Sequence, residues 1–387
     1  MVDKEKREKI KRKNKAKENF DYALLLIIVI LIGIGFVMLY STSSYTSQLE
    51  YGDSFYYVKK LLIALAVALI GLFFTVKIDY HFWFRFKWLW YIASVIAVLS
   101  VMIPGLGKTV NNARRWIVLG PLQIQPAEFV KLAMIIVIAW FICYLKKNVN
   151  YIRTMFVILA FTAFVSILIW AVNDNLSTAI IVFGIAAVMC FVANKKYTPF
   201  VAAAGTLVAL VSVFVVSIRN MNTSESFRIR RILVWLNPEQ YASEGGYQFM
   251  LGLYAIGSGG LFGKGLGKSI QKLGFIPEAQ NDMIFSIICE ELGLFGATAI
   301  LILFVMLLWR LVNIAIHAKD LFGSMIAVGV FAHIAIQVIL NVAVVTNTIP
   351  NTGITLPFIS YGGTSIVFLL AEMGIVLNVS SQCEYKE

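Results

Sequence analysis

The apolar residues of this chain are gathered into long runs that short polar segments separate. Ten such runs predict ten membrane-spanning helices, because a helix needs about 20 apolar residues to cross a bilayer. The predicted spans are residues 22–41, 58–76, 87–104, 127–145, 152–171, 176–194, 198–218, 283–309, 321–346 and 354–379. The first run is too long for the core of a signal peptide and no small-residue cleavage site follows it, so we expect it to remain as a span. The pattern predicts an all-α polytopic membrane protein.

Composition supports this fold class. The chain is 59% hydrophobic and only 14% charged, whereas a soluble domain carries about 25% charged residues. Its four cysteines form no CxxC pair, and three of them lie in or beside apolar runs. The sequence therefore indicates neither a disulfide framework nor a cysteine metal site.

The positive charge is concentrated in the N-terminal tail, residues 1–21. Nine of the first seventeen residues are Lys or Arg. A basic tail before a first span is typical of a cytoplasmic segment beside anionic lipid, so we do not expect nucleic-acid binding. An even number of spans would return the C-terminal tail, residues 380–387, to the cytoplasm. Residues 22–379 would then form the membrane domain.

Two loops predicted on the outer face carry cations against the topological rule. One, residues 105–126, holds Lys108, Arg114 and Arg115. The other, residues 219–282, holds seven: Arg219, Arg228, Arg230, Arg231, Lys264, Lys268 and Lys272. These cations suggest an anion site, although long loops also cross membranes regardless of their charge. The longer loop is rich in apolar residues, so we expect it to be ordered against the membrane, and its glycine cluster to form a bend.

Asp282 is the strongest candidate for chemistry. It lies where the long loop meets the eighth span, and an ionisable residue at such a place is a functional candidate. Partial burial would raise its proton affinity, which suits a general base. The alternative is an N-cap for the following helix. For Glu290 and Glu291, which follow on the same span, we expect ion pairing within the bundle.

Two further segments carry polar residues beside the membrane. Glu128 and Lys131 share a face of the fourth span, and either form a simple ion pair or help Arg114 and Arg115 to hold a diphosphate. The second segment, residues 350–365, opens the tenth span with Pro, Gly and hydroxyl residues. It is either the wall of a cavity near the outer surface or a small-residue packing face.

These segments together resemble the SEDS family, which comprises FtsW, RodA and SpoVE. The resemblance covers nearly the whole chain after the basic tail, and two strings, 271–279 and 374–380, favour the division and sporulation branch. Its most specific motifs are residues 113–117, 125–129, 246–248, 255–265, 277–282 and 356–363. The chain departs from the family pattern beside Asp282, where it reads Gln280-Asn281-Asp282-Met283 in place of His-Thr-Asp-Phe.

The resemblance implies a GT-C-like fold with a large extracytoplasmic loop between helices 7 and 8. It also implies a peptidoglycan glycosyltransferase of the bacterial cytoplasmic membrane that polymerises lipid II for division or sporulation. Asp282 would then be the catalytic base. The substrate-binding residues implied by the motifs are Arg114, Arg115, Lys131, Glu128, Gln125 and Ser360.

The implied partners are a class B penicillin-binding protein transpeptidase, other divisome proteins and membrane lipid. A divalent cation, Mg²⁺ or Mn²⁺, is compatible with this chemistry, but the sequence shows no ligand cluster for one. Two other functions remain open: a lipid II flippase, for which Asp282 would be dispensable, and a non-catalytic divisome scaffold. A generic secondary transporter fits less well, because the spans show no inverted repeat.

Overall fold

The computed structural model describes residues 19–110, 113–119, 122–145, 152–219 and 227–384. Most of the predicted basic tail and the last three residues lie outside this part of the chain. The side chains of Arg219 and Arg228 lie outside it as well.

Ten apolar helices correspond to the ten predicted spans, which confirms the all-α polytopic fold. They are α2 (Tyr22–Tyr51), α3 (Tyr56–Lys77), α5 (Lys87–Ser100), α6 (Pro126–Tyr144), α7 (Ile152–Asn173), α8 (Leu176–Ala193), α9 (Thr198–Arg219), α12 (Ile284–His317), α13 (Leu321–Val345) and α14 (Ser365–Ser380). Eight are long and apolar enough to cross a membrane, whereas α5 and α14 are shorter. The count of ten crossings therefore remains a prediction.

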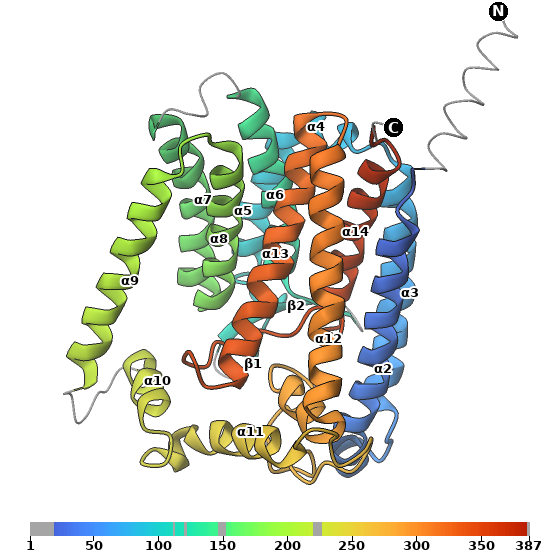
Figure 1. The fold of residues 1–387 in the computed structure, drawn as a ribbon, viewed down its shortest axis with the longest axis vertical. Coiled ribbons are helices and arrows are strands. Elements are labelled where there is room, and N and C mark those ends of the chain that lie inside the picture. Colours follow the sequence, from blue (N-terminus) through green and yellow to red (C-terminus); the bar gives the residue numbers. More distant parts are fainter. Residues whose placement is uncertain (1–18, 111–112, 120–121, 146–151, 220–226, 385–387) are drawn as a thin grey trace, which may run out of the picture.

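Both ends of the described chain lie at one end of the bundle, as Figure 1 shows. The Asn19 side-chain amide donates to the carbonyl oxygen of Cys383 at 2.8 Å, and the backbone N–H of Asp21 donates to the hydroxyl of Ser380 at 3.2 Å. The long loop lies at the opposite end, where it forms α10 (Phe227–Leu236), the 3-10 turn η1 (Ala242–Glu244) and α11 (Gly246–Gly259). This arrangement fits the predicted orientation, with the termini on one side and the loop on the other.

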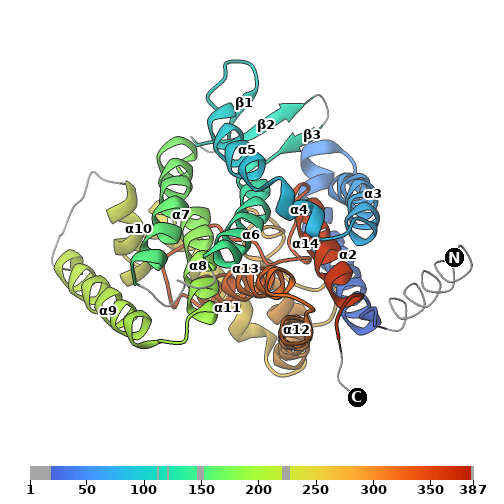
Figure 2. The ribbon, with the colours of Figure 1, turned by 90° about the horizontal axis from the view of Figure 1, so that it is seen from above.

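Helices α6 and α13 form the centre of the bundle (Figure 2). From Pro126 to Ile142, α6 buries every residue except Phe129, and it packs on α5, α8 and α13. Helix α9 lies apart from the bundle, and none of the residues in its most apolar stretch is buried. Polar residues that are buried on α6 and α13 are therefore enclosed by packed side chains on all sides.

The short outer loop contains a small sheet that the all-α prediction missed. Strands β1 (Gly107–Val110), β2 (Ala113–Leu119) and β3 (Leu122–Ile124) pair antiparallel in the order β1-β2-β3, with an irregular register between Lys108 and Thr109. The segment is too short and too polar for a span, but its Val and Ile residues favour extended backbone. The sheet extends beside α5 in Figure 2.

The predicted start of the tenth span was wrong by eleven residues. α14 begins at Ser365 instead of residue 354, because Pro357 and the Gly362-Gly363 pair oppose helix and Phe358 has a φ of +63°. The irregular segment packs closely on α2. A Cβ at Gly35 would lie 2.5 Å from the carbonyl oxygen of Phe358, so only glycine fits at that position.

Helix α12 is broken at Gly293, where φ is +69°. The backbone groups that this kink frees pair with the glycine cluster of the long loop: Lys264 N–H donates to the carbonyl oxygen of Glu290 and Gly265 N–H to that of Glu291, both at 2.9 Å. The glycine cluster therefore forms a bend, as the sequence predicted, and this bend packs on α12.

The side chains at this kink form two ion pairs, in both of which the glutamate is buried. The Lys264 ammonium lies 2.7 Å from the Glu290 carboxylate, and the Lys272 ammonium lies 2.7 Å from the Glu291 carboxylate. Ion pairing within the bundle was the expectation for both glutamates. Two of the outer-face cations thus hold the loop in place.

Candidate active site

Asp282 lies in the last turn of the long loop, directly before α12. Helix α12 begins at Ile284, its N-cap is Met283, and no side chain caps it. The capping alternative considered for Asp282 is therefore not observed. The backbone of Asp282 is fixed instead by Asn341 of α13, whose amide donates to the Asp282 carbonyl oxygen at 2.8 Å.

The environment of Asp282 increases the proton affinity of its carboxylate. The pKa of Asp282 is raised from 3.8 to about 6, chiefly by burial and also by the nearby charge of Glu278. Backbone N–H groups and the charge of Arg231 act in the opposite direction. At neutral pH the carboxylate is mostly ionised and still accepts a proton readily, which is the condition that a general base requires.

Two arginines from different outer segments converge beside the turn between α7 and α8. Arg115 of β2 donates to the carbonyl oxygens of Asn173 at 3.3 Å and Asp174 at 2.6 Å. Arg231 of α10 lies with its guanidinium 3.5 Å from the carbonyl oxygen of Asn351. Burial lowers the pKa of both guanidinium groups, and the charge of Asp174 raises both. The two cations thus share Asp174 as a charged neighbour, and Arg231 also interacts electrostatically with Asp282.

Arg231 was one of the outer cations noted in the sequence, but it was not among the predicted site residues. We include Arg231 in the site because its positive charge lowers the pKa of the Asp282 carboxyl group. No local pattern separated it from the other cations of the same loop, because the convergence of α10, β2 and the α7–α8 turn depends on tertiary packing.

Arg114 does not converge with Arg115. It is exposed, and neighbouring residues of a strand point to opposite faces. Only the second arginine of the predicted pair therefore reaches the α7–α8 turn.

Lys131 and Glu128 form an ion pair in the centre of the bundle. The Lys131 ammonium lies 2.9 Å from the Glu128 carboxylate, and Lys131 is 2% exposed. The hydroxyl of Ser365 donates to the other Glu128 oxygen at 2.8 Å, and Lys131 donates to the Gln337 amide oxygen at 3.1 Å. This is the simple pairing that the sequence left open as the alternative to diphosphate binding.

Gln125 and Ser360 stabilise backbone turns near this pair. Gln125 is the N-cap residue of α6, and its N–H donates to the Thr364 hydroxyl at 3.3 Å. The Ser360 hydroxyl accepts from the backbone N–H of Leu356 at 2.8 Å, which closes a turn in the irregular segment. In the structure Gln125 therefore lies at the start of α6, and Ser360 holds a turn in the segment that precedes α14. Their substrate-binding role remains a prediction.

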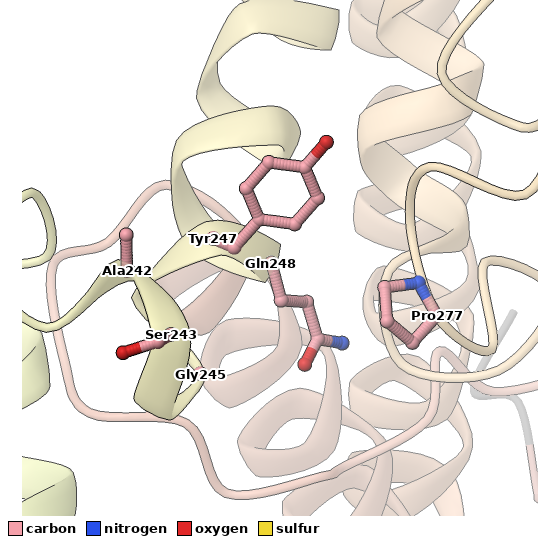
Figure 3. A pocket seen from close by; sticks show the side chains of 6 residues that line it. All are labelled: Ala242, Ser243, Gly245, Tyr247, Gln248 and Pro277. Carbon is pink, nitrogen blue, oxygen red and sulfur yellow. The ribbon is translucent and has the colours of Figure 1, made fainter.

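A pocket of about 430 Å³ opens between α11 and the loop that leads to Asp282. Figure 3 shows Tyr247 and Gln248 on the first turn of α11, with Pro277 opposite. The lining residues are Ala242, Ser243, Gly245, Tyr247, Gln248 and Pro277. Helix α11 is anchored directly beside Asp282, since a Cβ at Gly252 would lie 2.5 Å from the Met283 side chain.

The acidic residues near this site do not form a metal centre. Across the described ranges, no group of three or more His, Cys, Asp or Glu side chains is placed to hold an ion. The residues present therefore do not fit a metal site built by the protein alone.

The match to a family model settles the class of protein. Residues 22–385 match the model of the FtsW/RodA/SpoVE family, described as cell cycle proteins. The chain belongs to this family.

Individual relatives agree with the predicted branch. The chain is 42% identical over 349 residues to stage V sporulation protein E of Bacillus subtilis, covering 90% of this chain and 93% of the relative. It is 35% identical to a probable peptidoglycan glycosyltransferase FtsW of Trichlorobacter lovleyi, covering 89% of each.

Solved structures show the same fold. A chain from a peptidoglycan synthase complex, studied for its coordination of polymerization and crosslinking, superposes with a TM-score of 0.77 at 27% identity, covering 93% of this chain and 97% of that one. The rod shape determining protein RodA of Thermus thermophilus superposes with a TM-score of 0.65 at 26% identity, covering 95% and 98%.

Proposed function

We propose that this chain is a peptidoglycan glycosyltransferase that polymerises lipid II into glycan strands at the outer face of the bacterial cytoplasmic membrane. The observation that carries the proposal is the placement of Asp282, a carboxylate of raised proton affinity that lies within the electrostatic reach of Arg231, at the end of a loop whose Pro277 lines an open pocket. Relatives named as probable peptidoglycan glycosyltransferases support the same activity.

Asp282 acts as the general base. Its carboxylate takes the proton from the acceptor sugar's hydroxyl as that oxygen attacks the anomeric carbon of the donor. The bond from this carbon to the diphosphate breaks on the opposite face, so the new linkage is β and undecaprenyl diphosphate leaves. A base positioned in this way contributes roughly 10²- to 10⁴-fold to the rate.

Arg115 and Arg231 stabilise the charge that develops on the leaving diphosphate. Arginine is suited to this role because its planar guanidinium donates two parallel hydrogen bonds to phosphate oxygens. Lys131 is buried with its carboxylate partner, so its effect on the diphosphate is long-range electrostatics. The proposal routes no step through a divalent cation.

The location and partners follow from the same chemistry. Lipid II polymerisation at the outer face places α10 and α11 outside and both termini in the cytoplasm. The structural match to a chain of a peptidoglycan synthase complex supports a transpeptidase partner, for which we propose a class B penicillin-binding protein. The 42% identity to a sporulation protein supports a role in division or in the sporulation septum.

The test is polymerisation of purified lipid II by the detergent-solubilised protein, co-purified with its cognate transpeptidase. Wild type is compared with Asp282→Ala and with Asp53→Ala, a matched change at an exposed aspartate that pairs with Lys59 away from the site. We expect glycan ladders from wild type and from Asp53→Ala, and none from Asp282→Ala.

Other outcomes would contradict the proposal. Ladders from Asp282→Ala would remove Asp282 as the base. If no variant makes ladders while the partner still binds penicillin, a lipid II flippase or a non-catalytic scaffold becomes the better function.

A further inference from the structure

Helix α13 carries a row of three polar side chains at four-residue spacing: His333, Gln337 and Asn341, referred to here as the α13 row. Residues four apart lie on one face of a helix. The three are 1%, 2% and 0% exposed in an otherwise apolar helix. Polar groups buried at membrane depth are costly unless they are hydrogen-bonded, so each needs a reason to be there.

Asn341 joins the two segments that meet at the catalytic carboxylate. Its side-chain amide donates to the carbonyl oxygen of Asp282 at 2.8 Å and to that of Ile354 at 2.7 Å. Both acceptors belong to irregular backbone, which protein groups must satisfy at this depth. A single amide therefore fixes the residue before α12 against the segment that precedes α14.

Gln337 makes the equivalent connection one helical turn away, about 6 Å along the axis. Its amide nitrogen donates to the Thr355 carbonyl oxygen at 3.0 Å, and its amide oxygen accepts from the Lys131 ammonium at 3.1 Å. The reverse orientation of the amide would place N–H groups against the ammonium and an oxygen against a carbonyl. The contacts therefore fix which way Gln337 points.

His333 and Glu372 hold that orientation. The Nε2 atom of His333 lies 2.9 Å from the Gln337 amide oxygen, which only accepts, so Nε2 carries a proton. The Nδ1 atom lies 2.8 Å from a Glu372 carboxylate oxygen. The pair thus supplies a second donor to the oxygen that receives Lys131.

We propose that the α13 row is the positioning frame of the active site: Asn341 fixes Asp282 to the segment before α14, and Gln337 fixes Lys131 to the same segment. This rests on the proposed glycosyl transfer, in which a base and a cation must keep their places while substrate exchanges. A rigid central helix provides the common reference for both. All three residues are buried and hold other groups through hydrogen bonds, so they act as positioning residues.

The test uses Asn341→Leu and Gln337→Met, which remove the polar groups at similar volume. Ile339→Leu is the matched control, because Ile339 lies on the same helix but is 65% exposed. Each variant is purified with its partner and assayed for lipid II polymerisation from pH 5 to 9.

We expect Asn341→Leu to lower kcat by at least tenfold with KM for lipid II within twofold of wild type. The acidic limb of its pH profile should also move to lower pH, because a loosened Asp282 becomes better hydrated. Gln337→Met should lower kcat in the same way, and Ile339→Leu should match wild type.

Hydrogen–deuterium exchange provides a readout that does not depend on activity. In the purified protein, Asn341→Leu should increase exchange in peptides covering residues 280–285 and 353–361, and Ile339→Leu should not. Unchanged exchange would overturn the proposal whatever the activity. If Asn341→Leu increases exchange but keeps the kcat and the pH profile of the wild type, the proposal is also overturned, because the α13 row is then purely structural. A wild type without polymerase activity would refute the proposed function, and the exchange data would still decide whether the row holds the two segments.

Discussion

Replacing Asp282 with Asn should remove most of the activity and at the same time stabilise the protein at neutral pH. The change keeps the size of the side chain and removes its negative charge. The two effects have opposite signs because burial of the ionised carboxylate is unfavourable for the fold and useful for the chemistry. Replacing a purely structural residue would instead lower the activity and the stability together.

The size of the stabilising effect follows from the pKa. Burial raises the pKa of Asp282 from 3.8 to about 6, a difference of about 2.2. A difference of one in pKa corresponds to about 1.4 kcal/mol, so the ionised carboxylate lowers the free energy of unfolding by up to about 3 kcal/mol.

The pH dependence of that penalty has a definite direction. The folded state binds the proton more tightly than the unfolded chain, so the penalty is absent below pH 4, grows as the pH rises, and is complete above about pH 6. Asp282→Asn should therefore raise the unfolding temperature at pH 7.5 and leave it unchanged near pH 4.

The activity of the wild type should depend on the same ionisation. Only the deprotonated carboxylate accepts the proton, so the rate should fall as the pH drops through about 6, by roughly tenfold for each further pH unit. Asp282→Asn should lose about 10²- to 10⁴-fold of the rate at pH 7.5. Gel-based ladders from lipid II measure the rate, and thermal unfolding in the same detergent measures stability.

One result would refute this reasoning directly. If Asp282→Asn lowers the unfolding temperature at pH 7.5, the negative charge stabilises the start of α12, as an anionic side chain at a helix N-terminus does by about 0.3–1 kcal/mol. The argument from burial would then be wrong, even if activity were also lost.

Three further changes test other parts of the structure. Arg231→Leu should raise KM for lipid II about tenfold. It should also move the acidic limb of the pH–rate profile to higher pH, since Arg231 lowers the pKa of Asp282. An unchanged pH–rate profile would place Arg231 outside the site. Gly293→Ala should destabilise the fold by at least about 1–3 kcal/mol, because φ is +69° and the new Cβ would lie 2.3 Å from a backbone nitrogen of the loop. Its control in thermal unfolding is Gly257→Ala, because a Cβ at Gly257 would have no atom within 4 Å. Lys272→Met should cost about 3–5 kcal/mol by leaving a buried carboxylate unpaired, and a wild-type unfolding temperature would contradict the ion pair.

The helices were predictable because each apolar run is a local signal long enough to specify one element. Asp282 was chosen as a candidate for a similar reason, as a carboxylate at the edge of such a run, and its catalytic role remains a prediction. The sheet at residues 107–124 was missed because its strands are short and pair with one another instead of filling a span. The late start of α14 was misjudged because Pro357 and two glycines interrupt an otherwise apolar sequence.

The convergence of Arg115 with Arg231 was not predictable, since it joins β2 to a helix more than a hundred residues away through tertiary packing. The α13 row was visible in principle. His333, Gln337 and Asn341 recur every four residues within an apolar span, and that periodicity on a buried face is a signal for polar contacts between helices.

The departures from the family pattern beside Asp282 are accommodated by packing. Met283 is fully buried, and its methyl group would lie only 2.5 Å from a Cβ at Gly252, so the Met283 side chain packs directly on a glycine of α11. The backbone carbonyl of Gln280 accepts from Tyr361 N–H at 2.9 Å, and the Asn281 amide donates to Glu278 at 2.8 Å.

None of the three substituted side chains is among the groups that set the pKa of Asp282, which are burial, backbone N–H donors and the charges of Glu278 and Arg231. In this chain the three residues therefore anchor the start of α12 by packing and hydrogen bonds and add no charge beside its carboxylate. We expect their effect on the rate to act through the position of Asp282, which Asn341 also holds from α13. Activity in this chain should accordingly be more sensitive to changes at Asn341 or Gly252 than to restoring the family residues at 280 and 281.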